Sequence, residues 1–213
     1  SAPASGNGDC ACLYLGSEPV PERELINVIH PSQGGRLVSY TSHLTAAYSA
    51  PNLTDGFRTG MARSWISRAN PGAPQGFVWG FSNDQAAVLS EARIWNYGQA
   101  DLGASRYSRG FRIDVSSDSN TFTTVVTGVL ANNTNMQSFN LGSNSARYVR
   151  LVITNGYDSS YWELGEVEMW GQLVVDTNRP VPGIAACVAV TNANPILITY
   201  TGAVDTGGSG LSK

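Results

Sequence analysis

The chain has 213 residues, of which 42% are hydrophobic and only 14% are charged, whereas roughly 25% are charged in an average soluble protein. This low charge excludes a highly charged disordered chain. The formal charge of -3, with no cluster of arginines, argues against nucleic acid and anionic membranes as partners. No stretch approaches the roughly 20 apolar residues of a membrane span, so membrane insertion is not expected.

The composition also predicts the class of fold. The chain has 23 glycines, abundant Ser, Thr and Asn, and a single lysine at Lys213. It is therefore rich in turn formers and poor in strong helix formers, which predicts a mostly β protein.

The predicted elements follow an N-terminal extension, residues 1–23, that carries Pro, Gly and Ser without periodicity. Apolar or alternating runs, typical of strands, occur at 25–29, 36–40, 77–81, 88–95, 111–115 and 149–153. Turn-forming segments such as 31–35 and 116–120 separate them. About eight short strands within residues 24–171 predict an all-β sandwich or jelly roll.

The composition changes after residue 171. Residues 172–183 are predicted to be a proline-punctuated linker, and 185–190 and 195–200 to be two strands of a short C-terminal β extension. Two strands in about 40 residues cannot close a hydrophobic core alone. Residues 184–213 are therefore predicted to be part of a module rather than a complete domain.

Three cysteines, Cys10, Cys12 and Cys187, fit neither a zinc site nor a disulfide-dense small fold. Two interpretations stay open. They are unpaired small hydrophobic residues, or one disulfide joins Cys10 or Cys12 to Cys187 and leaves one thiol over.

The most informative segments, in chain order, are APNLTDGFRT (50–59), SWIS (64–67), ARIWNY (92–97), SRGFRIDVSSD (108–118), FTTVV (122–126) and LGEVEMWG (164–171). Each is common alone, but their order and spacing resemble the discoidin or coagulation factor 5/8 type C family. That family overlaps the galactose-binding-like family 32 carbohydrate-binding modules. The resemblance covers residues 24–171 and implies an eight-stranded jelly-roll β-sandwich whose first and last strands lie side by side.

The resemblance also implies a structural calcium between the loop at 50–59 and the start of the last strand. Asp55 and Glu166 would supply carboxylate oxygens. Carbonyl or hydroxyl oxygens would come from Asn52, Phe57, Thr59 and Gly165. Calcium takes 6–8 hard oxygen ligands, which a loop rich in Asp, Asn and Thr can supply. The alternative is that Asp55 only closes an Asx turn and that Glu166 faces solvent.

A sugar site is implied in the loops at one end of the sandwich. There an aromatic ring stacks on the apolar face of a pyranose, and polar side chains bond its hydroxyls. The candidates are His43, Tyr48, Tyr97, Arg106, Tyr107, Tyr157, Tyr161 and Trp162. The alternative for Trp162 is packing under the edge of the sandwich. Trp65, Trp79 and Trp95 are expected in the core or its rim.

No catalytic constellation is found, so an enzyme is not expected. His30 and His43 lack metal-ligand spacing, and the chain has no Gly-x-Ser-x-Gly motif. Glu166 and Glu168 point the same way from one strand and cannot act on opposite sides of a bond.

The sequence therefore predicts a non-catalytic carbohydrate-binding or adhesion module, extracellular or at the cell surface, with a glycan as partner. The rival interpretation is a structural subunit of a surface layer or extracellular fibre that assembles with neighbouring subunits through its terminal β segments. It rests on residues 174–213, which resemble the first strands of a bacterial immunoglobulin-like domain. A third interpretation is a fragment of a larger surface protein with further domains.

Overall fold

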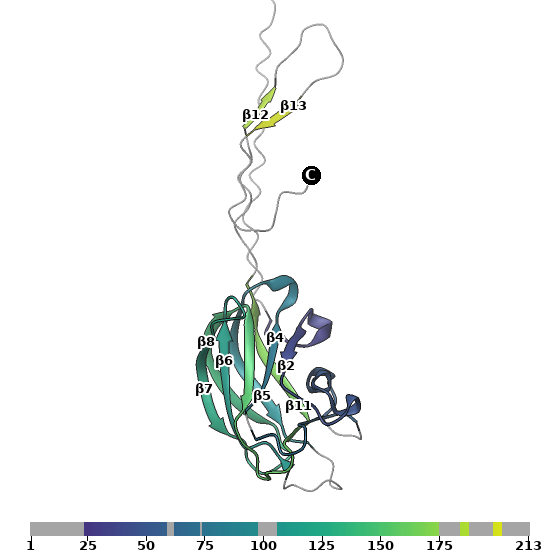
Figure 1. Cartoon of the computed structure of the whole chain (residues 1–213). Coiled ribbons are helices and arrows are strands. Elements are labelled where there is room, and N and C mark those ends of the chain that lie inside the picture. Colours follow the sequence, from purple (N-terminus) through teal and green to yellow (C-terminus); the bar gives the residue numbers. More distant parts are fainter. Residues whose placement is uncertain are drawn as a thin grey trace, which may run out of the picture.

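The computed structural model describes residues 24–58, 62–72, 74–97, 106–174, 184–187 and 198–201. Two antiparallel sheets form a sandwich (Figure 1). One sheet has the order β1-β11-β5-β8, with β1 at Ile26–Asn27, β11 at Glu166–Leu173, β5 at Ala87–Trp95 and β8 at Gln137–Ala146. The other has the order β2-β4-β9-β6-β7, with β2 at Arg36–Tyr40, β4 at Gln75–Gly80, β9 at Tyr148–Ile153, β6 at Gly110–Ser116 and β7 at Thr123–Val129.

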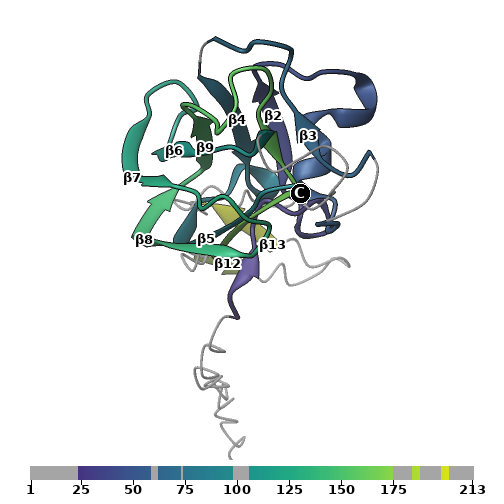
Figure 2. The same cartoon turned by 90° about the horizontal axis from the view of Figure 1, so that it is seen from below.

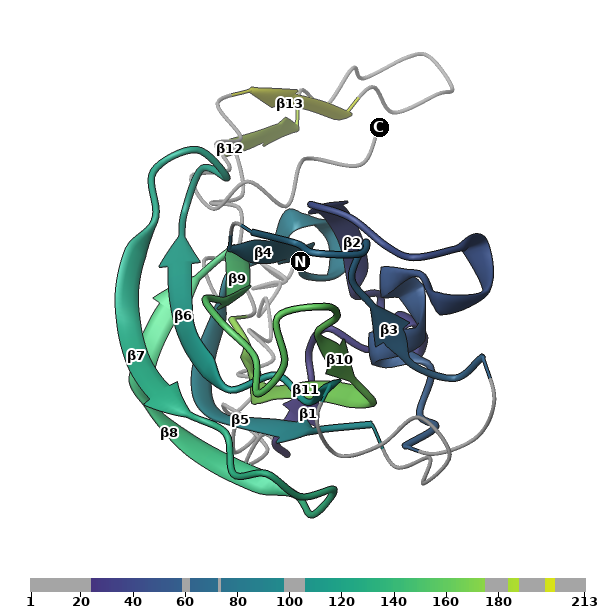
Figure 3. The same cartoon turned by 60° about the horizontal axis from the view of Figure 1, so that its bottom comes forward.

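Short elements complete the sandwich. A two-stranded sheet pairs β3, Trp65–Ile66, with β10, Glu163–Leu164. The 3-10 helices are η1 Pro31–Gln33, η2 Ala46–Tyr48, η3 Ala50–Thr54 and η4 Ser82–Asp84. β7 and β8 contact each other at one edge of the sandwich (Figure 3). Within the described residues, no helix is long and apolar enough to cross a membrane.

The predicted β-sandwich is confirmed, including the adjacency of its first and last strands. Ile26 and Asn27 of β1 pair with Gly171 and Trp170 of β11. Alternation along β6 and β9 places their apolar side chains in the core between the sheets, where the rings of Phe111 and Phe139 meet at 4.5 Å.

Part of the C-terminal segment is also described. β12, Ile184–Cys187, pairs antiparallel with β13, Ile198–Thr201, and these strands overlap the ones predicted at 185–190 and 195–200. Residues 188–197 lie outside the described residues. The immunoglobulin-like resemblance, the domain boundaries and the assembly role stay predictions. Cys10 and Cys12 lie outside the described residues, as does most of the predicted linker.

Trp65, Trp79 and Trp95 are buried, as expected for core or rim residues. The indole of Trp65 meets the ring of Phe77 edge-on at 4.7 Å, and Phe77 stacks on Trp79 at 5.9 Å. Together with the aliphatic side chains of both sheets, these rings fill the centre of the sandwich.

One charged group on the outer face of the five-stranded sheet is nevertheless buried. The carboxylate of Asp114 accepts hydrogen bonds from Thr124 Oγ1 at 2.7 Å, from Arg150 Nε at 2.9 Å and from Arg112 Nε at 3.1 Å. Burial raises the pKa of Asp114, but these three donors outweigh burial and hold the pKa below its ordinary value. The carboxylate therefore ties three strands together.

Asp114→Asn is expected to destabilise the fold by about 2 kcal/mol, because it turns a donor toward two arginines and removes their counter-charge. Since the folded pKa is lowered, this contribution is present above the ordinary pKa and is lost as pH falls through the folded value. Urea unfolding at pH 7 measures it. The control is Asp84→Asn, which breaks the exposed Arg36–Asp84 pair and should change stability by less than ~0.5 kcal/mol. Equal losses in the two variants would contradict the role of Asp114.

Candidate functional site

Four loops gather at one end of the sandwich. The register pairs Tyr40 with Phe77, Gln75 with Ile153 and Phe111 with Ile153. The loops that continue β2, precede β4, follow β9 and precede β6 therefore leave the sheet at the same end. Figure 2 looks at the molecule from this end. The described residues of these loops are 41–49, 67–72 with 74, 96–97 with 106–109, and 154–162, and we call this surface the loop end.

Backbone hydrogen bonds hold the described parts of the loop end together. The loop 154–162 lies in the middle. On one side, Ser67 N–H donates to the carbonyl of Trp162 at 2.9 Å and Asn70 N–H to that of Ser160 at 2.7 Å. On the other side, Tyr157 N–H donates to the carbonyl of Tyr107 at 2.9 Å. The central loop is therefore ordered by its neighbours, which favours a preformed binding surface.

Three of the predicted sugar contacts lie in the interior instead. Tyr97 is fully buried, and Tyr107 and Trp162 are only 7% exposed. The indole of Trp162 donates to the carbonyl of Asp158 at 3.0 Å and lies directly against Gly156, where no side chain intervenes. None of the three rings offers a free face for stacking, so the prediction of an exposed platform at these positions was wrong. For Trp162, the alternative of packing under the edge is what the structure shows.

Two predicted tyrosines are accessible. Tyr157 is 38% exposed, and its hydroxyl donates to the carbonyl of Leu130 at 2.8 Å. The guanidinium carbon of Arg109 lies 5.5 Å from its ring centre. Tyr161 is partly exposed, and the guanidinium of Arg106 lies 4.9 Å from its ring centre. Each ring is thus held by an arginine of the same short segment, residues 106–109.

Arg106 also reaches inward. Its Nη1 lies 3.6 Å from a carboxylate oxygen of Glu163, which is fully buried in β10. Burial, followed by the negative charge of Glu163, raises the pKa of the neighbouring Tyr107 hydroxyl. The buried carboxylate of Glu163 therefore holds in place Arg106, whose guanidinium packs against the ring of Tyr161.

The remaining predicted contacts lie on the loop after β2. The Nδ1 atom of His43 lies 3.1 Å from the Tyr40 hydroxyl, and its ring centre lies 5.6 Å from that of Tyr40. The indole of Trp65 donates to the carbonyl of Ser42 at 2.7 Å, which fixes this loop to the core. Tyr48 is half-buried at the end of η2.

The two predicted carboxylate ligands, Asp55 and Glu166, lie near each other at the start of β11, where the loop at Gly56 meets that strand. Glu166 is only 1% exposed, and its Oε1 accepts a hydrogen bond from Gly56 N–H at 3.2 Å, whereas its Oε2 has no hydrogen-bond partner among the described residues. Burial raises the pKa of Glu166 to about 9, and the charge of Asp55 adds to this increase. The alternative in which Glu166 faces solvent was therefore wrong.

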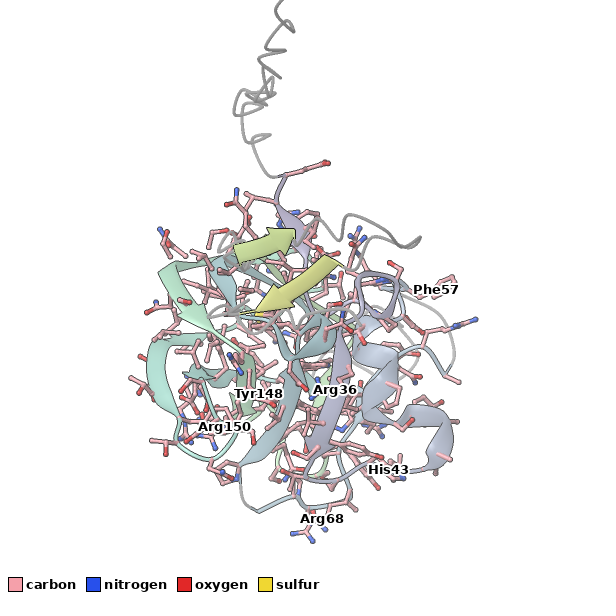
Figure 4. All side chains as sticks on the ribbon, turned by 90° about the horizontal axis from the view of Figure 1, so that it is seen from above. Arg36, His43, Phe57, Arg68, Tyr148 and Arg150 are labelled. Carbon is pink, nitrogen blue, oxygen red and sulfur yellow. The ribbon has the colours of Figure 1, made fainter. Side chains whose placement is uncertain are left out.

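Asp55 does form the Asx turn of the alternative interpretation. Its Oδ1 accepts from Phe57 N–H at 2.9 Å, and its Oδ2 lies 3.3 Å from Arg63. The ring of Phe57 is 50% exposed and projects at the periphery of the molecule (Figure 4). Thr59 lies outside the described residues.

Asn52 and Gly165 shape the backbone around the candidate metal site. The Asn52 side-chain amide donates to the carbonyls of Ala47, Ala62 and Ser64 at 2.8, 3.2 and 2.8 Å. It therefore orders the loop. A Cβ at Gly165 would lie 3.0 Å from the carbonyl oxygen of Arg58, so glycine permits this close approach.

The residues around Glu166 fit a calcium ion through one buried carboxylate oxygen, not through a cluster of acidic side chains. Among the described residues, no group of three or more His, Cys, Asp and Glu side chains could hold a metal, so backbone oxygens would have to supply much of the coordination. The Oε2 atom of Glu166 is buried near a second carboxylate and has no hydrogen-bond partner among the described residues, so a cation would stabilise its negative charge.

Sequence reasoning missed Arg109. It lies in the segment 108–118, just before the strand predicted at 111–115, and no local pattern distinguishes it from an ordinary surface arginine. Only the backbone pairing of residues 108–109 with the loop 154–162 identifies it: Ser108 bridges to Gly156, and the Arg109 N–H donates to the carbonyl of Asn155 at 3.0 Å. These contacts carry Arg109 to the side of Tyr157.

Solved structures share this fold. The family 32 carbohydrate-binding module of C. perfringens NanJ, in complex with galactose, is 17% identical, with a TM-score of 0.56 over 69% of this chain and 99% of that one. The chitosan-binding module 1 of a Paenibacillus sp. IK-5 chitosanase/glucanase is 21% identical, with a TM-score of 0.54 over 68% and 99%. Allantoicase from Saccharomyces cerevisiae is 13% identical, with a TM-score of 0.56 over 69% of this chain and 43% of the enzyme.

No curated protein shows significant similarity to the chain. The model of the F5/8 type C domain matches residues 38–167, which run from β2 into the start of β11 and include the loop end and the Asp55–Glu166 pair. The sandwich, its adjacent terminal strands and this match agree: the chain belongs to the F5/8 type C domain family.

Proposed function

We propose that the chain is a non-catalytic module that binds a glycan at the loop end. The observation that carries this proposal is the pair of accessible tyrosines, Tyr157 and Tyr161, on a loop that its neighbours hold in place. The neighbouring structures that bind galactose and chitosan support the choice of a glycan.

The physical basis is the match between a tyrosine ring and a sugar. A pyranose presents an apolar C–H face with a polar rim, and an ordered aromatic ring buries that face at little entropic cost. The Leu130 carbonyl fixes the Tyr157 hydroxyl, so this ring needs little rearrangement to bind. Arg106, Arg109 and His43 lie on the same end and can bond hydroxyls at the rim.

We also propose a structural calcium ion beside Glu166. Asp55 and Glu166 would bind it with carboxylate oxygens, and Asn52, Phe57, Thr59 and Gly165 with backbone or hydroxyl oxygens. The ion would supply positive charge where Glu166 is buried without a second hydrogen bond. It would hold the loop of η3 against the start of β11.

A location outside the cell or on its surface is part of the same proposal. A glycan ligand is most accessible there.

Removing either ring is expected to weaken glycan binding. Tyr157→Ala and Tyr161→Ala should each reduce affinity about tenfold, the loss of one stacking contact. Affinity electrophoresis of the 213-residue chain in gels containing galactan, chitosan or no polysaccharide measures the effect.

The matched control lies at the opposite end of the sandwich. Tyr148 also carries an arginine, Arg36, with its guanidinium 5.9 Å from the ring centre, and the two lie side by side in Figure 4. Tyr148→Ala should leave retention unchanged. Retention that neither loop-end variant lowers, or that Tyr148→Ala lowers equally, would contradict the proposed site.

A further inference from the structure

The arginines of the described residues fall into two groups. Seven lie in ion pairs with carboxylates: Arg36, Arg58, Arg63, Arg93, Arg106, Arg112 and Arg150. The other three, Arg68, Arg109 and Arg147, form no ion pair with any carboxylate in the part of the chain that the structure describes. Within this part of the chain no carboxylate neutralises their charge, and the hydrogen bond from Arg68 Nη2 to the carbonyl of Pro71 at 3.3 Å leaves the charge of Arg68 in place.

Two of these three arginines flank the accessible tyrosines. Arg109 lies beside Tyr157, with 5.5 Å between the guanidinium carbon and the ring centre. Arg68 lies on the opposite side of the central loop, because its neighbours Ser67 and Asn70 donate to the carbonyls of Trp162 and Ser160. Arg147 lies at the other end of the sandwich, where its N–H donates to the carbonyl of Ser116.

The described acidic groups at the loop end are already engaged. Glu163 is buried and paired with Arg106 at 3.6 Å. Asp158 accepts the backbone N–H of Ser160 at 2.5 Å. Neither lies in an ion pair with Arg68 or Arg109. Among the described residues, therefore, no carboxylate pairs with these two arginines, in a chain whose formal charge is -3.

We propose that the loop end recognises an anionic glycan. One sugar unit of this glycan stacks on a tyrosine, and the next unit carries a carboxylate or a sulfate ester. This inference rests on the proposed glycan-binding function and names its ligand class. Tyr157, which lies beside Arg109, stacks on the first sugar unit. Arg109 and, across the central loop, Arg68 bind the anionic group. A planar guanidinium that is free of a protein carboxylate donates two parallel hydrogen bonds to such a group.

The test compares three ligands that share one core: lactose, 3′-sialyllactose and 3′-sulfolactose. Isothermal titration of the 213-residue chain at ~50 mM and ~300 mM salt gives their affinities. Sialyllactose or sulfolactose should bind about tenfold more tightly than lactose at low salt, and the advantage should shrink at high salt. The stronger of the two identifies the anionic group.

Three variants locate the effect. Arg109→Gln should remove most of the advantage of the anionic ligand, taken as the ratio of its affinity to that of lactose for the same variant, and Arg68→Gln should remove part of it. Arg147→Gln, the control, should preserve the full advantage, since it removes an equal charge at the opposite end. Circular dichroism of each variant confirms that the fold is retained.

The outcomes separate the two claims. Equal binding of all three ligands, or an advantage that Arg147→Gln reduces as much as Arg109→Gln does, overturns the anionic ligand class but leaves glycan binding standing. Failure of every ligand to bind, together with no retention in any polysaccharide gel, overturns both claims.

Discussion

Glu166→Gln is expected to stabilise the calcium-free protein at pH 8 and to abolish its stabilisation by calcium. Burial raises the pKa of Glu166 from 4.5 to about 9. A raised pKa means that the folded state binds the proton more tightly than the unfolded state does. The contribution of this group is therefore complete below pH 4.5 and is lost as pH rises toward 9.

The effect of the raised pKa on stability is measured as a change in the melting temperature, Tm. In EDTA, the Tm of the natural chain should fall between pH 5 and pH 8, whereas that of Glu166→Gln should fall less and end at least about 5 °C higher. Glutamine has no charge to desolvate, and its carbonyl can still accept from Gly56 N–H. Millimolar calcium should raise the Tm of the natural chain at pH 8 and leave that of the variant unchanged.

The control is Glu91→Gln on β5. Glu91 is partly exposed, and hydrogen bonds from Arg93 and Ser138 lower its pKa. This variant should lose a little stability at neutral pH and keep the full response to calcium. A calcium response that is identical in the natural chain and in Glu166→Gln would contradict the proposed metal site.

Gly156→Ala is expected to damage both stability and glycan binding. A Cβ at this position would lie 2.3 Å from Cδ1 and 2.7 Å from Nε1 of the buried Trp162. The indole cannot yield without losing its hydrogen bond to the Asp158 carbonyl. We expect a loss of about 2–3 kcal/mol in unfolding free energy and displacement of the neighbouring Tyr157.

Gly76→Ala supplies the matched comparison at the same end of the sandwich. There the nearest atom to an added Cβ, Thr41 Oγ1, lies at an ordinary 3.7 Å. Urea unfolding and gel retention of both variants should show a large loss for Gly156→Ala and almost none for Gly76→Ala. Similar values for the two variants would show that Trp162 does not hold the loop in the way described.

The sandwich was predictable because its strands are half-buried. Along β6 and β9, the core residues Phe111, Ile113, Val149, Leu151 and Ile153 alternate with outward-facing residues, most of them polar. This period of two is visible in the sequence without knowledge of the partner strands. The adjacency of β1 and β11 was not visible in any periodicity and came from the family resemblance.

The candidate site was only partly predictable, because burial of a loop residue depends on distant partners. Trp162 and Tyr157 look alike in sequence as aromatic residues of one loop. One is buried because Gly156 leaves room for an indole, and the other is exposed with its hydroxyl on Leu130. In the sequence, Glu166 looks like an outward-facing residue of an alternating strand. In the folded protein the loop at Gly56 covers it.

The loop end is expected to be the one surface of the chain that binds a glycan. Titration of the isotopically labelled chain with 3′-sialyllactose and with lactose tests this directly, with the amide chemical shifts as the measured quantity. Shifts are expected to gather at residues 106–109 and 154–163, whereas residues 117–121 and 147, at the opposite end, should stay unchanged. Shifts confined to the opposite end or to a sheet face would contradict it.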